Sequence, residues 1–376
     1  MRILHWAHSL FSENGGLEEF VRSLSEGLRA RGHSVAFVSE KPRQSEHPEG
    51  RAEWYPHHHL IDLEGVETGS SPAQTLSKVR QSLDSFVSEF RPDLIHLHSV
   101  GRGDMAFLVP LARTLSFPVI YTAHAPFDAP GHINHLHAIK DRVNAVIYPS
   151  EFMRSQGEIY MPVWDSLSRV IKNGVKVAPD RPDFSNPGTI FASGRHVADK
   201  GFQILIASLP IVRQTHPDAT LVLAGSGPDT PILKNLSRVL GVDDMVSWPG
   251  WVTRQAASEY VSSSTVACVP SVWNEPFGLV AAEAAMAGTP VVASSVGGLS
   301  EIVLHGESGF LVSPGDIALL GIALTTILGD PELRHSMSQT AQDIARGHFS
   351  ISTNIDLHET LYQELVHTTL PGAADD

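Results

Sequence analysis

Short apolar runs alternate with helix-length amphipathic stretches along the whole of this 376-residue chain. This alternation is typical of parallel β-sheets covered by helices, because each crossover between parallel strands needs a helix-sized segment. The runs of strand length in the first half are Ile3–Ala7, Val35–Ser39, Leu94–Leu97, Val119–Thr122 and Val146–Tyr148. Those in the second half are Thr189–Ala192, Leu221–Ala224, Met245–Trp248, Val266–Val269 and Val291–Ala293. The sequence therefore predicts two doubly wound α/β domains.

A run of turn-forming residues between positions 173 and 188 interrupts the alternation and predicts the domain boundary. We expect one domain over residues 1–172 and a second over 173–349. A last helix is expected over residues 350–366; it could pack on either domain, and joining the first is one of these two alternatives. The other predicted helices are Leu17–Ala30, Leu76–Phe90, Met105–Leu115 and Asn134–Arg142. Residues 41–75 show no pattern that assigns a conformation.

Charge and cysteine content exclude several classes of protein. The chain has 41 acidic and 27 basic residues and a formal net charge of -14, which disfavours general attraction to nucleic acid or to an anionic membrane. A lone Cys268, in an apolar run, forms neither an internal disulfide nor a thiolate metal cluster. Neither a signal peptide nor an apolar stretch of membrane-spanning length is recognisable. We therefore expect a cytoplasmic protein.

Two basic residues, Arg195 and Lys200, lie five positions apart in the loop after the first strand of the second domain. Cations are scarce there, since residues 173–376 contain 10 Lys and Arg against 21 Asp and Glu. A diphosphate needs local countercharge, for which Arg offers a planar fork and Lys a mobile point charge. The loop is a candidate phosphate site; the alternative is a solvated loop with two incidental bases.

A second candidate segment, residues 270–284, follows the Val266–Val269 strand. Pro276 and Gly278 mark the turn into a helix, whose first N–H groups would face a ligand at the strand ends. These N–H groups are expected to belong to Phe277, Gly278 and Leu279. Glu275 precedes the helix and Glu283 lies about a turn and a half into it, so two carboxylates could accept hydrogen bonds from vicinal hydroxyls. Capping is the alternative role, and it suits Glu275 better than Glu283.

In the first domain, Gly15-Gly16 follows the first strand and opens a helix, where glycines would let the backbone approach a phosphate. A plain turn explains the pair equally well. Neither a P-loop nor a dinucleotide fingerprint occurs.

The histidine clusters His57-His58-His59 and His132…His135…His137 lack the geometry or the partners of a metal site. The sequence therefore predicts no metal and no cofactor.

Taken together, the motifs resemble glycosyltransferase family 4. The resemblance rests on the spacing of Glu275 and Glu283, on the Ser-Gly-Arg and Asp-Lys-Gly pieces of the 193–201 loop, and on Ala-Gly-Ser-Gly-Pro at 224–228. Further matching positions follow in the family's order: Gly15-Gly16, Pro92-Asp93, His124, Pro149-Ser150 and Asn173-Gly174. The resemblance implies the GT-B fold, in which two Rossmann-like domains face a central cleft. It also implies a retaining transferase that uses a nucleoside diphosphate sugar.

For the donor diphosphate, the resemblance implies contacts from Arg195 and Lys200. Gly16 would approach from the opposite domain. The backbone amides that would complete the phosphate cradle are those of Phe277, Gly278 and Leu279. Charge stabilisation of the departing diphosphate would then be the largest catalytic contribution.

For the remainder of the donor, the resemblance implies that Glu283 holds the ribose diol and Glu275 the hydroxyls of the transferred sugar. His124 matches the family's cleft histidine near that sugar, whereas a lone histidine is otherwise more often structural. The residues expected near the nucleobase are Gly225, Ser226, Trp251 and Val252. One departure is His196, which stands where the family usually has an apolar residue.

A UDP-sugar is the favoured donor, with a GDP-sugar as second choice, and the acceptor is a hydroxyl of unassigned identity. Two hypotheses from other classes stay open. One is a glycoside hydrolase with Glu275 and Glu283 as its acid and nucleophile, which leaves the cation loop without a purpose. The other is a two-domain sugar-binding protein without catalysis.

Overall fold

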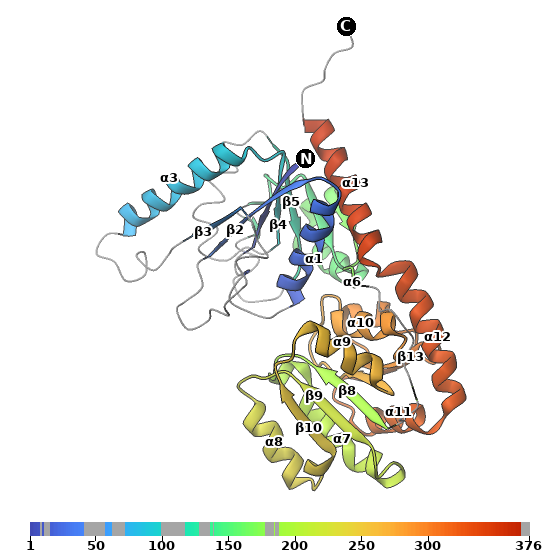
Figure 1. Ribbon diagram of the computed structural model, residues 1–376. Helices are drawn as coiled ribbons and strands as arrows, with labels where there is room; N and C mark the ends of the chain where they lie inside the picture. The colour runs from blue at the N-terminus through green and yellow to red at the C-terminus, as the bar shows by residue number, and fades with distance from the viewer. Residues whose placement is uncertain are drawn as a thin grey trace. The chain divides into compact units, whose positions relative to one another are not determined.

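The computed structural model (Figure 1) describes residues 1–7, 10, 16–40, 57–61, 72–98, 117–127, 136–137, 139–176, 184 and 188–369. The chain forms two compact units. Unit 1 comprises Met1–Lys172 with Ser352–Asp376, and unit 2 comprises Asn173–Ile351. Each unit contains one parallel sheet with helices on it, so the predicted α/β class with two doubly wound sheets is confirmed.

Unit 1 has a seven-stranded sheet in the order β3-β2-β1-β4-β5-β6-β7, and all its pairs are parallel. Its strands are β1 (Arg2–Trp6), β2 (Ser34–Glu40), β3 (His58–Ile61), β4 (Leu94–Leu97), β5 (Val119–Thr122), β6 (Ala145–Tyr148) and β7 (Ser168–Val170). The strand order reverses between β1 and β4, where open α/β sheets gather ligands. Two strands were not predicted: β3 lies in the unassigned 41–75 segment, and β7 is a three-residue edge strand.

Successive side chains of β1 point to opposite faces of this sheet. Leu4 and Trp6 belong to a large apolar cluster on one face, whereas Ile3 and His5 point to the other. Unit 1 contains the helices α1 (Gly16–Ala30), α3 (Pro72–Phe90), α6 (Glu151–Tyr160) and most of α13 (Ile351–Thr369), with the 3₁₀ segment η2 (Pro162–Leu167). The predicted helix Met105–Leu115 lies outside the described residues, as do positions 134, 135 and 138 of the predicted helix Asn134–Arg142, in which residues 136, 137 and 139 are helical.

Helix α13 returns to unit 1 after the chain has built unit 2, and it lies beside α1 (Figure 1). Arg31 binds Asp356 and Glu359 of α13, with N–O distances of 2.6 and 2.7 Å. Tyr362, fully buried, places its hydroxyl 2.6 Å from Nδ1 of His96 on β4. Electrostatic contacts at the surface and a buried hydrogen bond therefore hold the last helix on this unit.

Unit 2 has a six-stranded sheet in the order β10-β9-β8-β11-β12-β13, again with every pair parallel. Its strands are β8 (Thr189–Ser193), β9 (Thr220–Ala224), β10 (Val246–Gly250), β11 (Val266–Val269), β12 (Val291–Ser294) and β13 (Gly309–Val312). Strand β13 was not predicted, and Met245 ends a 3₁₀ turn (η4, Asp243–Met245) before β10.

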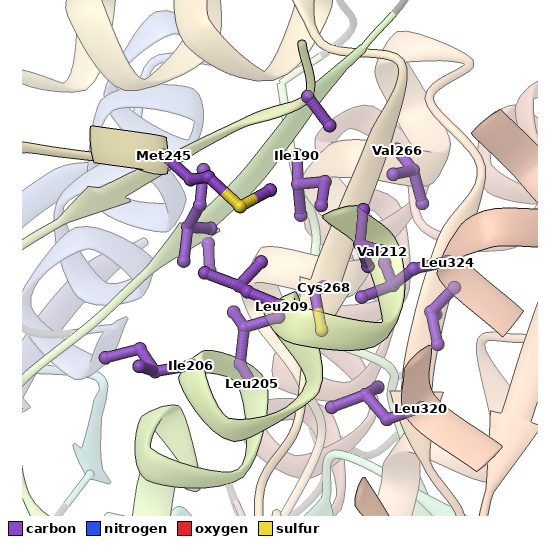
Figure 2. Packing of buried hydrophobic residues seen from close by; sticks show 14 of the residues in the cluster. Ile190, Leu205, Ile206, Leu209, Val212, Met245, Val266, Cys268, Leu320 and Leu324 are labelled. Carbon is purple, nitrogen blue, oxygen red and sulfur yellow. The ribbon is translucent and has the colours of Figure 1, made fainter. Parts of the chain in front are cut away.

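Both faces of this second sheet are buried, as parallel sheets require. Ile190 of β8 enters one apolar cluster and Phe191 the other. Figure 2 shows the first cluster, in which α7 and α11 meet the strands and the buried Cys268 lies among leucines. Burial raises the pKa of this thiol. The helices of unit 2 are α7 (Phe202–Thr215), α8 (Thr230–Val239), α9 (Arg254–Ser263), α10 (Leu279–Ala287), α11 (Ile317–Gly329) and α12 (Pro331–His348).

In the part of the chain that the structure describes, none of the helices is both long enough and apolar enough to cross a lipid bilayer.

Candidate functional site

Loops at the carboxyl edge of the unit 2 sheet carry most of the candidate residues, and backbone hydrogen bonds join these loops. The N–H of Gly194, after β8, donates to the carbonyl of Ala224 at 3.1 Å. The N–H of Gly225 donates to the carbonyl of Gly250 at 2.7 Å, and that of Val272 to the carbonyl of Asp199 at 2.9 Å. The edge is therefore a connected surface at which unpaired helix amides and side chains can meet one ligand.

The loop after β8 presents its two cations differently. Arg195 is exposed, whereas Lys200 ends the short 3₁₀ segment η3 (Ala198–Lys200) and is partly buried. Gly201 follows with φ of 70°, and a Cβ there would lie 1.8 Å from the carbonyl oxygen of Pro270. Glycine is required at this position because the β8 loop lies directly on the β11 loop. Lys200 is thereby held against the segment that contains Glu275.

Lys200 and Glu275 form an ion pair, with 2.6 Å between Nζ and Oε1. The same carboxylate oxygen accepts hydrogen bonds from the Ser271 hydroxyl at 2.7 Å and from Trp273 Nε1 at 3.0 Å. Nζ of Lys200 also lies 5.1 Å from the centre of the Trp273 ring. The sequence indicated both charged residues but not their contact, and it did not indicate Ser271 or Trp273 as partners.

Burial explains why this cluster needs several donors. Glu275 is 7% exposed, and a buried carboxylate is stable only when it is paired and hydrogen-bonded. The ion pair and the two further donors fix the carboxylate and with it the position of the ammonium group. The structure thus presents a lysine that is held in a fixed orientation at the edge of the sheet.

The start of helix α10 differs from the prediction. The helix begins at Leu279, and Gly278 is its N-cap residue with φ of 113°. This conformation is left-handed, so Gly278 cannot belong to the helix. Phe277 lies one residue earlier, 2% exposed, with its ring edge-on to Phe349 at 5.7 Å between centroids. The unpaired amides of the helix start therefore begin with that of the N-cap residue Gly278 and continue with that of Leu279, and the Phe277 amide precedes them.

Glu283 lies in the second turn of α10 and meets a cation that the sequence did not indicate. Its Oε1 is 3.8 Å from Nη2 of Arg254, the first residue of α9. The side chain is 38% exposed, yet the surrounding protein desolvates the carboxyl group and raises its pKa, which the guanidinium opposes. Glu283 and Glu275 therefore stand in different surroundings.

Two glycines that the sequence analysis did not single out support the Glu275 loop. The N–H of Gly298 donates to the carbonyl of Glu275 at 2.8 Å. Gly297 has φ of 53°, and a Cβ there would lie 2.2 Å from the same carbonyl oxygen. They begin the 3₁₀ segment η5 (Gly297–Glu301). Their role in supporting the β11 loop is visible only from their contact with that loop in the folded chain.

The residues predicted for the nucleobase lie at the other end of this edge. Trp251 is 51% exposed, and Val252 is half-buried. The carbonyl of Ser226 accepts a hydrogen bond from His196 N–H at 2.9 Å. The His196 ring is itself buried, edge-on to Phe202 and Trp248, with Nδ1 2.9 Å from the Thr230 hydroxyl. An imidazole can therefore occupy this apolar position because a threonine satisfies one of its nitrogens.

Two predicted residues of the first domain are described within unit 1, and one is not. Gly16 is exposed and begins α1, and half-buried His124 follows β5. Gly15 lies outside the described residues. The structure therefore places the candidate residues in two sets, one for each unit.

His124 is the outer member of a chain of imidazoles. Its Nε2 is 3.2 Å from Nδ1 of His98, and Nε2 of His98 is 2.8 Å from Nδ1 of His5. His5 and His98 are fully buried, as are His96 and His358 beside them. This cluster could not be found from histidine spacing along the chain, as the runs His57-His58-His59 and His132…His135…His137 were. Its members come from β1, β4, the residues after β4 and β5, and α13.

Burial keeps these rings neutral. Desolvation lowers the pKa of His5 and of His124 to about 3, with a smaller effect from His358 in both cases and from Arg29 on His5. Burial also lowers the pKa of His358 to about 4, although the Asn354 carbonyl opposes the shift. The pKa values of His96 and His98 are lowered for the same reason.

Comparison with protein families gives a match for nearly the whole chain. Residues 14–178 match the model described as "Glycosyltransferase Family 4", and residues 178–344 match "Glycosyl transferases group 1". The two matches meet close to the boundary between the units.

Curated relatives are similar over most of their length. Glycogen synthase of Mycobacterium tuberculosis is 30% identical over 371 residues, which cover 90% of this chain and 88% of the relative. Phosphatidyl-myo-inositol mannosyltransferase of Mycobacterium leprae is 29% identical, with 86% of each chain covered.

Solved structures share the fold. Sucrose-phosphate synthase from Thermosynechococcus elongatus has a TM-score of 0.79 at 24% identity and covers 97% of this chain and 99% of its own. Anabaena HepE in complex with UDP-glucose has a TM-score of 0.79 at 22% identity and covers 96% of this chain and 100% of its own. These likenesses establish the GT-B fold for the chain.

The close contact at Gly297 predicts a strong effect of a single methyl group. In Gly297→Ala, the Cβ meets the Glu275 carbonyl, so we expect a loss of several kcal/mol in the free energy of unfolding, measured with urea. Gly315→Ala is the matched control, because Gly315 also has positive φ (81°) but open space around it. It should lose about 1 kcal/mol. Equal losses in both variants would contradict the packing described.

The buried imidazoles predict acid sensitivity. Because their folded pKa values lie below the unfolded value of about 6.5, the unfolded chain binds more protons as the pH falls below 6.5. Each ring should then lower the free energy of unfolding by about 1.4 kcal/mol per pH unit. Urea unfolding at pH 7.5 and 5.5 measures this, a range in which ordinary carboxylates stay ionised.

The matched variants are His358→Leu, which removes one buried ring and should reduce the pH dependence, and His335→Gln, which alters an exposed ring and should not. Equal stability of the parent protein at the two pH values would show that the rings are not buried in their neutral form.

Proposed function

Because this chain belongs to the glycosyltransferases, with a family 4 domain followed by a group 1 domain, we propose that it transfers a sugar from a nucleoside diphosphate sugar to an acceptor hydroxyl with retention of anomeric configuration. A UDP-sugar is the proposed donor and a GDP-sugar the second choice. The observation that carries the proposal is the preformed Lys200–Glu275 pair beside the start of α10. The names of the relatives, a glycogen synthase and a mannosyltransferase, support sugar transfer.

The proposed donor site lies along the carboxyl edge of unit 2. Arg195 and Lys200 bind the diphosphate, together with the amides of Phe277, Gly278 and Leu279 at the start of α10. Glu275 binds hydroxyls of the transferred sugar while it orients Lys200, and Glu283 holds the ribose diol. Gly225, Ser226, Trp251 and Val252 surround the base. HepE, which shares the fold, was solved with UDP-glucose, and that favours a uridine nucleotide here.

In the proposed reaction, the bond between the anomeric carbon and the diphosphate oxygen breaks, and the acceptor oxygen bonds to that carbon on the same face. The acceptor proton passes to the departing phosphate oxygen, so the protein needs no covalent carboxylate intermediate. The developing negative charge is stabilised by Arg195, by Lys200 and by the α10 amides. We propose that these fixed positive groups replace a divalent metal ion, and that Gly16 and His124 of unit 1 contact the same donor.

The hydrolase hypothesis fits the site less well. Oε1 of Glu275 already accepts hydrogen bonds from Lys200, Ser271 and Trp273, so this oxygen is engaged within the protein and not directed at a glycosidic bond. A hydrolase also gives Arg195 no role. Membership of the glycosyltransferases disfavours a binding protein without catalysis, which would show donor affinity and no turnover.

The test is release of nucleoside diphosphate from UDP-, GDP- and ADP-sugars in the presence of mixed hydroxyl acceptors, with and without EDTA. We expect release with one class of donor and no effect of EDTA. A protein that ignores every sugar nucleotide but cleaves oligosaccharides would be the hydrolase instead.

Lys200→Ala and Glu275→Ala should each lower kcat on the order of 10²–10³-fold, because each removes part of the preorganised charge. Steady-state rates of diphosphate release measure the loss, and circular dichroism verifies that the variants are folded. Lys234→Ala and Glu332→Ala, exposed on α8 and α12, are the matched controls and should keep parental rates. Near-parental turnover in Lys200→Ala would remove Lys200 from the mechanism.

Glu283→Ala should raise the donor KM more than it lowers kcat, because ribose contacts persist unchanged from the ground state to the transition state. The loss of two ribose hydrogen bonds predicts an increase in KM of roughly 10-fold or more. An equal fall in kcat with unchanged KM would contradict ribose binding by this residue.

A further inference from the structure

Three adjacent strands of unit 1 bring three histidines into one line at the carboxyl edge of the sheet. His5 lies in β1, His98 directly follows β4, and His124 follows β5 by two residues. The line therefore crosses the point between β1 and β4 where the strand order reverses. His5 and His98 are buried, and only His124 reaches the surface of its unit.

Proton counting leaves two arrangements for this line. Each neutral imidazole carries one N–H, so three rings have three, and the two ring-to-ring hydrogen bonds use two of them. Because His98 has a single proton to donate, both hydrogen bonds must run in the same direction along the line. The third N–H then lies at one end, either on Nε2 of His5 or on Nδ1 of His124.

The two ends differ in their surroundings. Nε2 of His5 is buried and has no hydrogen-bond partner among the described residues. A buried N–H without an acceptor costs about 1–3 kcal/mol, and such orphaned donors are rarer than unpaired acceptors. Arg29 also acts on the His5 ring with positive charge, which favours a bare nitrogen there. The half-buried His124 ring can accommodate the third N–H without this penalty.

From this difference we infer that His5 and His98 are positioning residues that fix His124 as a neutral ring with its proton on Nδ1. His5 Nδ1–H donates to Nε2 of His98, and His98 Nδ1–H donates to Nε2 of His124. His124 then offers a hydrogen-bond donor, and neither an acceptor nor a positive charge, at the ligand edge. Resting on the proposed function, this assignment makes His124 a donor to an oxygen of the bound sugar.

A metal ion is the competing use of these rings. Nitrogens of His5, His96 and His98 lie within 4.8 Å of one another. Both nitrogens of His96 are already in hydrogen bonds, to Tyr362 and Thr122 at 2.6 Å. Among the residues that the structure describes, the titratable groups that act on the cluster are other histidines and Arg29, with no carboxylate to balance a dication. The hydrogen-bonded line accounts for the rings better.

The direct test is the ring ¹⁵N spectrum of the full chain labelled with ¹⁵N-histidine, in which protonated and bare nitrogens resonate far apart. His124 is assigned by the signal that disappears in His124→Gln. We expect a proton on Nδ1 and a bare Nε2 at pH 7. A proton on Nε2, on both nitrogens, or a stoichiometric transition metal by mass spectrometry would overturn the inference. This readout needs no turnover, so it stands or fails separately from the proposed transferase activity.

The second test removes His98, the ring that joins His5 to His124 through hydrogen bonds. His98→Phe should convert His124 to a mixture of tautomers and lower kcat/KM of the diphosphate-release assay about tenfold, the equivalent of one lost hydrogen bond of about 1.4 kcal/mol. His98→Gln retains a donor and should restore both readouts in large part. If His98→Phe does not fold, His5→Phe, whose ring can stack on Phe37 as His5 does, gives the same tautomer test. An unchanged His124 spectrum in the folded variant would overturn the positioning role.

Discussion

Parallel pairing of every strand is the constraint on which the rest of this molecule depends. Because all the described strands of each sheet point in one direction, their carboxyl ends form a single edge, and loops that leave this edge can meet one another. The loops after β8, β9, β11 and β12 of unit 2 contact one another through backbone hydrogen bonds. Residues as distant in sequence as Lys200 and Gly298 thereby hold the same residue, Glu275: Lys200 contacts its carboxylate and Gly298 its backbone carbonyl.

The two units use this edge with different chemistry. In unit 2, a charged pair is held rigid by a hydroxyl and an indole, which suits the binding of a strongly charged group. In unit 1, buried neutral imidazoles occupy the corresponding edge, which suits an uncharged ligand with hydroxyl groups.

The fold class could be predicted from the sequence, because short apolar runs separated by helix-length segments are typical of parallel sheets with crossover helices. The strands missed were β3, in a segment rich in polar residues, and the short edge strands β7 and β13, whose patterns are too brief to distinguish. Lys200 and Glu275 could be singled out by charge and by position in motifs. Their contact, and the roles of Arg254, Gly297 and His98, depend on distances between separate loops, which no spacing along the chain encodes.

Because α13 returns to unit 1, the two units differ in when all of their residues become available during synthesis. Unit 2 is continuous in sequence and can fold once residue 351 has left the ribosome. Unit 1, although it is translated first, obtains Tyr362 and the acidic partners of Arg31 only after unit 2 is complete. The histidine-rich face of its sheet therefore lacks its contacts with His358 and Tyr362 until the last helix has been made, although Phe20 of α1 can already lie against it.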